Sequence, residues 1–186
     1  MATDSGVVTA NLDALRQGSD LIRRLPDAGY GEATDGAAPV GPHFRHVIEH
    51  YSCFLAGHAS GRVNYDARER DPALERERDP ALERDRDAAL ARIEELAGEL
   101  RRLAGADLEA AAEVRLECGS GGEPAQWSRS TVGRELQFLL SHTVHHFALI
   151  GLLLAQRGIG TGADFGVAPS TLEHRRAQPA CAPHPG

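Results

Sequence analysis

The chain has 186 residues, of which 41% are hydrophobic and 25% are charged. This composition is typical of a globular domain that buries a core of its own, and it excludes a disordered chain. The formal net charge is −7, and without a clustered basic face the chain is not expected to bind nucleic acid. The three cysteines are widely spaced and form no CxxC pair, which argues against a disulfide framework.

Hydrophobic residues recur at helical spacing in four segments of the chain. The predicted helices cover residues 6–25, 42–56, 81–104 and 131–158. Pro26 ends the first of them, and a loop rich in glycine, alanine and proline follows. Pro42 stands in the first turn of the second helix, and Gly158 suits the C-cap of the fourth. The pattern therefore predicts an all-α domain.

Between the third and fourth helices, residues 112–129 alternate apolar and polar side chains around a glycine-rich turn, which predicts a short β-hairpin. After the fourth helix we expect irregular chain until Ser170 or Thr171, where one last helical turn can begin. We interpret residues 1–176 as a single domain and expect 177–186 to be disordered.

An eight-residue segment, RERDPALE, occurs at 68–75 and again without change at 76–83. Each copy contains an Asp–Pro pair that can start a helix, so the third helix could begin at either copy. A charged docking arm is one interpretation. We favour a tandem duplication that an exposed connection tolerates.

The longest apolar run, residues 136–155, is about long enough to span a bilayer. It contains Gln137, Ser141 and three histidines, so we interpret it as a central, buried helix and exclude a membrane span. Residues 1–17 lack the basic start and the apolar centre of a signal peptide. We therefore expect a cytoplasmic protein that does not act on membranes.

The fourth helix carries His142, His145 and His146. His142 and His146 are i and i+4, so they lie on one helix face with Cβ atoms about 6 Å apart. This spacing lets both rings reach one metal ion at about 2.0–2.1 Å. His145 lies about 60° to one side and is expected at the rim of such a site. Thr143 stands where metalloproteases of the HExxH type have glutamate, so the motif does not support that chemistry.

A second histidine cluster lies in the second predicted helix, where His43, His46 and His50 fall within about 60° of one another around the axis. Six of the nine histidines therefore project from two helices that we expect to pack together. The competing interpretation is a set of core histidines bonded to carbonyls and carboxylates. Two clusters in one small domain favour a metal site. Glu135, two turns before His142, is a candidate acceptor for the N–H of a ligand histidine, or simply a carboxylate favoured at a helix start.

Two segments, VGPHFRHVIEHY at 40–51 and LLSHTVHHFALI at 139–150, resemble the DinB-like superfamily, which includes thiol-dependent transferases. The resemblance implies a four-helix bundle with up-down-down-up topology, often dimeric, that binds Zn²⁺ or Ni²⁺ through three histidines. It places the ligands on His46, His142 and His146, and His50 is the alternative to His46. His43, His50 and His145 are additional to the family's usual three.

Three neutral histidines leave open positions on a metal, as catalytic sites do. We therefore predict a metal-dependent enzyme, a thiol-dependent transferase or a hydrolase, acting on a small molecule with a low-molecular-weight thiol as a candidate partner. His50, His145 and Glu135 are the candidates for moving protons. The alternative is a non-catalytic metal-binding or dimerising helical module, and in either case we expect a homodimer.

Overall fold

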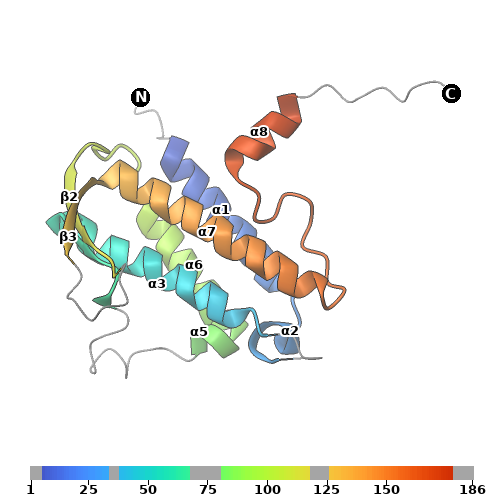
Figure 1. Ribbon diagram of the computed structural model, residues 1–186. Coiled ribbons are helices and arrows are strands. Elements are labelled where there is room, and N and C mark those ends of the chain that lie inside the picture. The colour runs from blue at the N-terminus through green and yellow to red at the C-terminus, as the bar shows by residue number, and fades with distance from the viewer. Residues whose placement is uncertain (1–5, 34–37, 68–80, 118–125, 178–186) are drawn as a thin grey trace.

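The computed structural model describes residues 6–33, 38–67, 81–117 and 126–177 (Figure 1). Within these residues the chain is predominantly helical and carries one small three-stranded sheet. The helices are α1 (Gly6–Arg24), α2 (Asp27–Gly31), α3 (Gly41–Gly57), the short 3-10 helix η1 (His58–Ser60), α5 (Ala81–Arg84), α6 (Arg86–Arg101), α7 (Val132–Ala155) and α8 (Pro169–Ala177). The strands are β1 (Arg62–Asn64), β2 (Ala111–Arg115) and β3 (Trp127–Thr131).

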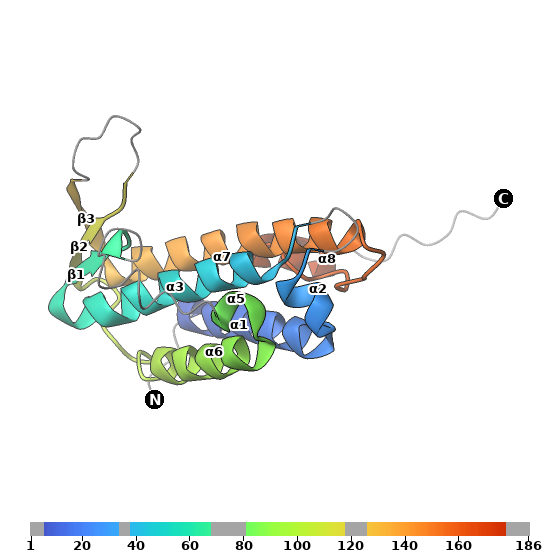
Figure 2. The same ribbon diagram turned by 90° about the horizontal axis from the view of Figure 1, so that it is seen from below.

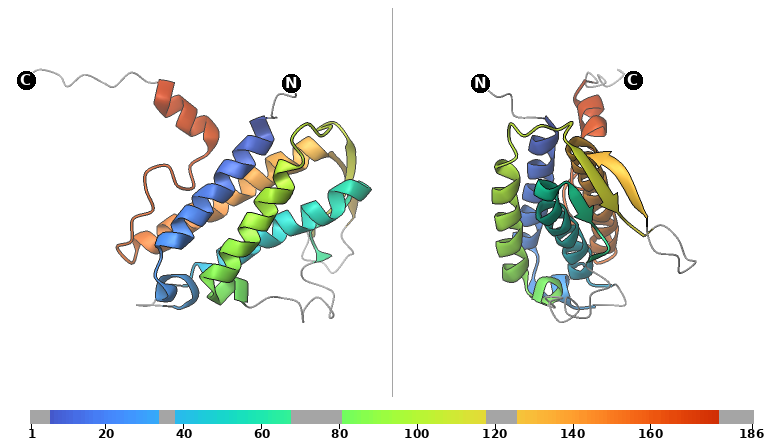
Figure 3. Two further views of the ribbon diagram at one scale, coloured as in Figure 1. Left: turned by 180° about the vertical axis from the view of Figure 1, so that it is seen from behind. Right: turned by 90° about the vertical axis from the view of Figure 1, so that its left-hand side faces the viewer.

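The four long helices pack in two layers, with α3 beside α7 in one layer and α1 beside α6 in the other (Figure 2). The layers are joined because α1 also contacts α7 and α3 also contacts α6. Seen from behind, α1 and α6 cover the inner faces of α3 and α7 (Figure 3). The sheet lies at the end of the molecule where α3 finishes and α7 begins, and this places it next to the histidine-bearing helices.

A buried polar network joins three of the long helices inside this core. Tyr51 of α3 is fully buried, and its hydroxyl donates to Asn11 Oδ1 of α1 over 2.7 Å. Asn11 in turn donates to the Leu136 carbonyl of α7 over 3.0 Å. Thr143 Oγ1 donates to the Leu139 carbonyl of its own helix over 2.7 Å and lies 3.3 Å from the Tyr51 hydroxyl. These bonds satisfy polar groups that would otherwise destabilise an apolar interior.

The third predicted helix, 81–104, is divided in the structure. Asp85 has extended backbone dihedrals and accepts hydrogen bonds from the N–H groups of Asp87 and Ala88, so it ends α5 and caps the start of α6. An aspartate at an N-cap stabilises a helix start, and this local signal overrides the continuous apolar spacing. The loop predicted after Pro26 contains the short helix α2, and the last predicted turn is the nine-residue helix α8.

The predicted hairpin is confirmed in its two arms, because β2 pairs with β3 in antiparallel register from Ala111 opposite Thr131 to Arg115 opposite Trp127. Strand β1 was not predicted, and it pairs in parallel with β2. Its three residues are too few to show a period in the sequence. The hairpin turn, most of the duplicated segment and the expected disordered tail from 178 onward lie outside the described residues.

Helix α7 buries one face only, contrary to the expectation of a central helix. Its buried positions recur at helical spacing, among them Leu136, Leu139, Phe147 and Ile150, whereas Leu152 is 64% exposed. Among the described helices, α7 alone is long and apolar enough to cross a membrane, a test that a core helix of a soluble protein also passes. Its contacts with α1 and α3 account for the buried face.

Candidate metal centre

The structure brings the two predicted histidine clusters together, because α3 and α7 pack side by side and their histidine-bearing faces meet. The nitrogen atoms that His46, His50 and His142 can offer to a metal all lie within 4.8 Å of one another. In a tetrahedral zinc site with bonds of about 2.05 Å, ligand nitrogens are about 3.3 Å apart. These three residues are therefore close enough together to be candidate ligands of one ion, and imidazole nitrogens bind zinc, copper, iron and nickel alike.

His50 is held in the tautomer that a metal ligand needs. Its Nδ1 lies 2.8 Å from the His46 carbonyl oxygen, and a carbonyl can only accept, so Nδ1 carries the proton and Nε2 keeps its lone pair. Metal-binding histidines commonly donate their second nitrogen in this way. The side chain is almost fully buried, against the rings of Tyr65 and Phe138, whose centroids are 5.6 and 6.1 Å away.

His146 also lies beside the cluster, with its ring centroid 4.5 Å from that of His46 and 4.6 Å from that of His142. Its Nδ1 is 3.0 Å from Nδ1 of His43, so one of these two nitrogens donates to the other. His146 therefore lies next to the cluster and is bonded to a histidine outside it. The trio His46, His142 and His146 therefore stays a prediction, and His50 and His146 compete for the third position.

Two further histidines border the cluster. His43 is partly buried, and burial first, then the charge of His145, lowers the pKa of its imidazole below the ordinary value of 6.5. The neutral form, which can accept a hydrogen bond, is therefore favoured. His145 is exposed, and its ring centroid is 5.3 Å from that of His146. It lies at the solvent edge, as its position on the helix predicts.

Glu135 is buried, and both of its oxygens are bonded to hydroxyl groups. Tyr65 donates to Oε2 over 2.8 Å and Ser130 donates to Oε1 over 2.5 Å. The carboxylate thus lies one residue behind the cluster, because the Tyr65 ring separates it from His50. Burial, followed by the charge of Glu135, raises the pKa of Tyr65 above its ordinary value. Tyr65 was missed from the sequence because the strand before it was not predicted.

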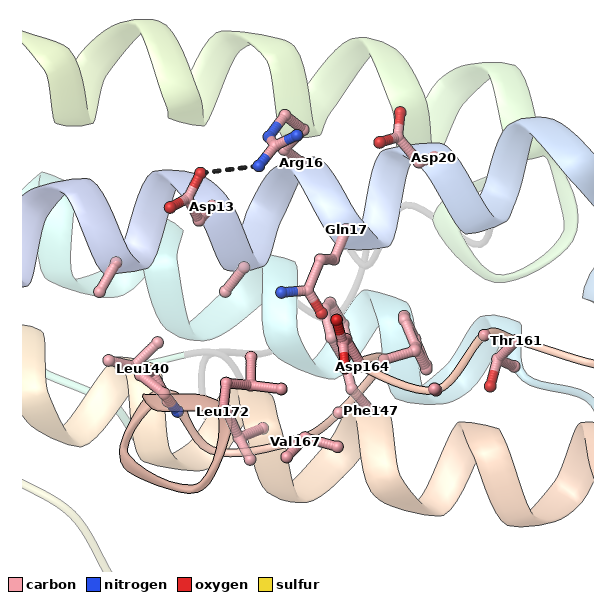
Figure 4. Close-up of a pocket in the computed structure, with 18 of the residues that line it drawn as sticks. Asp13, Arg16, Gln17, Asp20, Leu140, Phe147, Thr161, Asp164, Val167 and Leu172 are labelled. Atoms are coloured by element: carbon pink, nitrogen blue, oxygen red, sulfur yellow. Dashed lines mark hydrogen bonds and ion pairs between the residues drawn. The ribbon is translucent and has the colours of Figure 1, made fainter. Parts of the chain in front are cut away.

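Two cavities differ in their relation to the cluster. A groove of about 600 Å³ lies between α1, α7 and the segment that leads into α8 (Figure 4). On α7 it is lined by Leu140, Val144 and Phe147, which face away from His142 and His146 at helical spacing. No histidine lines it. A smaller pocket of about 240 Å³ is lined by Tyr65 and Phe138, the two rings that also contact His50.

Comparison with known proteins gives matches to parts of the chain. Residues 12–150 match the model of the DinB superfamily. A stretch of 50 residues, 27% of this chain, is 40% identical to FK506-binding protein 5 of Rhizopus delemar and covers 13% of that protein. Because the match covers so little of that relative's length, it does not assign a function to this chain. No solved structure matches the chain.

Proposed function

Because the chain belongs to the DinB superfamily, we propose that it is a metalloprotein whose histidine cluster between α3 and α7 binds one divalent ion, Zn²⁺ or Ni²⁺. The observation that carries the proposal is the convergence of His46, His50 and His142, whose ligand nitrogens lie within 4.8 Å of one another. The family's up-down-down-up four-helix bundle belongs to the same proposal. The ring of contacts from α1 to α6, α3, α7 and back to α1 supports it.

His46 and His142 belong both to the cluster of the structure and to the set that the family resemblance favours, and we assign the third position to His50, which the sequence offered only as the alternative to His46. Its buried ring and its Nδ1–carbonyl bond orient Nε2 before any ion arrives. His146, which the family resemblance favours, is the competing third ligand. Its bond with His43 must be kept or replaced when the ion binds.

An ion with three neutral ligands would supply a Lewis acid that lowers the pKa of a thiol or a water molecule at an open position. The protein is in this proposal a metal-dependent enzyme, a thiol-dependent transferase or a hydrolase. The exposed imidazole of His145, at the solvent edge of the cluster, exchanges protons with solvent. Tyr65 and Phe138 cover His50 and exclude water from that side.

Elemental analysis of the untagged protein after dialysis against Zn²⁺ or Ni²⁺ tests the metal site. We expect one ion per chain in the wild type, and we expect His46→Ala, His50→Ala and His142→Ala each to lose it. His58→Ala is the control, since His58 contacts Phe54 and no histidine of the cluster. A wild type without metal would refute the site. Loss in His146→Ala with retention in His50→Ala would move the third ligand to His146.

A second function, a dimerising module, is favoured by the apolar surface of α7, where Leu152 is 64% exposed. Contiguous apolar surface marks interfaces, and Leu152 is the exposed large apolar residue of α7 through which pairing can be tested. Light scattering measures the mass of the wild type and of Leu152→Glu. A dimer that becomes a monomer in the variant supports pairing through α7.

A specific thermal shift of the metal-loaded protein with a low-molecular-weight thiol supports the enzyme, and its absence favours the module. A cytoplasmic location remains part of this proposal.

A further inference from the structure

The pocket of about 240 Å³ lies between the sheet and the first turns of α7. Two of its lining residues also touch the histidine cluster. The Phe138 ring stacks on His142 with 5.5 Å between centroids, and the Tyr65 ring stacks on His50 at 5.6 Å. Phe138 and Tyr65 contact each other at 5.3 Å. One layer of aromatic rings therefore separates the pocket from the proposed metal ligands. In the larger groove, the lining ring of Phe147 contacts Phe44 and Phe165 instead.

The inner wall of the pocket is apolar, since Val114, Leu116 and Phe138 line it. Glu135 is also in the wall, and its carboxylate accepts hydroxyls from Tyr65 and Ser130. A buried carboxylate disfavours a second negative charge placed next to it. The inner part of the pocket therefore suits the apolar body of a ligand.

The remaining lining residues are two exposed arginines, Arg129 of β3 and Arg134 of α7. Within the described residues no ion pair joins either of them to a carboxylate, whereas Arg16, Arg23 and Arg92 each have an acidic partner. Arginine stays charged at every working pH, and its planar fork matches a carboxylate. Among the lining residues, two positive charges and the one negative charge of Glu135 leave an excess of one positive charge, while Glu113, opposite Arg129 in the sheet, is paired with Arg62. A monoanion would balance this excess.

We propose that this pocket binds a small carboxylate with an apolar body, its acid group at Arg129 and Arg134 and its apolar end against Phe138. The volume lies below the usual range of about 300–1,000 Å³ for drug-sized ligands, so the ligand is small. That this compound is the substrate of the metal centre rests on the proposed function. Phe138 would then separate the bound ligand from His142 until its half-buried ring moves.

The test compares benzoate with benzamide, which have the same shape and differ in charge, by titration calorimetry on the full chain. We expect benzoate to bind at least about tenfold more tightly than benzamide, because only benzoate can form a charge-assisted hydrogen bond with the arginines. Arg134→Gln and Arg129→Gln should each weaken benzoate by about that factor and leave benzamide unchanged. Arg101→Gln on α6 is the control, since Arg101 does not line the pocket. Equal binding of the two compounds, no binding of either, or no effect of either variant would overturn the proposal.

The same samples separate this proposal from the metal site. In protein loaded with paramagnetic Ni²⁺, the proton signals of bound benzoate should broaden, and in protein loaded with Zn²⁺ they should stay narrow. Broadening supports a ligand beside the metal centre. Benzoate that binds through Arg134 without broadening, in protein that holds Ni²⁺, would overturn the link to the metal. Protein that takes up no metal but still prefers benzoate refutes the proposed function and leaves the carboxylate pocket standing.

Discussion

Replacement of Tyr51 by phenylalanine removes one hydroxyl from the centre of the core without changing the volume of the ring. Tyr51 and Asn11 are both 0% exposed, and the lost bond is the 2.7 Å donation to Asn11 Oδ1. Thr143 loses little, because its hydroxyl hydrogen already has the Leu139 carbonyl 2.7 Å away. The variant therefore leaves one buried amide oxygen without a donor.

An unsatisfied buried acceptor costs about 1–3 kcal/mol of the free energy of unfolding. In a domain of this length, 1 kcal/mol corresponds to a change in Tm of about 2–4 °C, so Tyr51→Phe should lower Tm by about 2–12 °C. Urea unfolding followed by circular dichroism measures the same change as a lower midpoint with an unchanged slope. The expected loss of stability comes from the Asn11 oxygen, which is left without a hydrogen-bond donor. The packing of the ring is unchanged.

Tyr30→Phe is the matched control. Tyr30 is also buried, but its hydroxyl donates over 2.6 Å to the Leu82 carbonyl in a partly buried place that water can reach. Its loss should cost no more than an ordinary net hydrogen bond, about 0.5–1.5 kcal/mol. If Tyr51→Phe proves no more destabilising than Tyr30→Phe, the argument from the buried amide of Asn11 is wrong.

Three further predictions concern pH, a helix cap and a close contact. Burial raises the pKa of Tyr51 above its ordinary value of 10.0, so the folded chain keeps a proton that the unfolded chain releases above pH 10. Stability present below that pH is therefore lost as the pH rises, and Tm between pH 8 and 11 should fall more steeply in wild type than in Tyr51→Phe. Asp85→Ala removes the acceptor of two backbone N–H groups at the start of α6, so it should lower the free energy of unfolding in urea by about 0.5–2 kcal/mol. An unchanged free energy would show that Asp85 does not stabilise the helix as a cap. Gly166 has φ +68°, and a Cβ there would lie 2.6 Å from the Ala148 nitrogen, whereas Gly162, with φ +98°, has open space around it. Gly166→Ala should therefore lower Tm more than Gly162→Ala, and equal losses would show that backbone strain alone decides.

The helices could be predicted because their signals are local. The buried faces of α1, α3 and α7 recur every 3.6 residues over four turns or more, and this period is visible without tertiary contacts. The break at Asp85 was missed because apolar spacing continues across it. Strand β1 was missed because a three-residue strand is stabilised only by its partner β2.

The sequence alone also determined which histidines share a helix face. Spacing within one helix sets His142 beside His146 and places His43, His46 and His50 together, since these positions depend only on the helix period. Only the tertiary structure decided which nitrogens meet across the two helices. The rotation and offset of α3 against α7 follow from the packing of their apolar faces, and they bring His142 to His46 and His50 while they pair His146 with His43. The same packing placed Tyr65 and Phe138, far apart in the sequence, in one wall between a pocket and the histidine cluster.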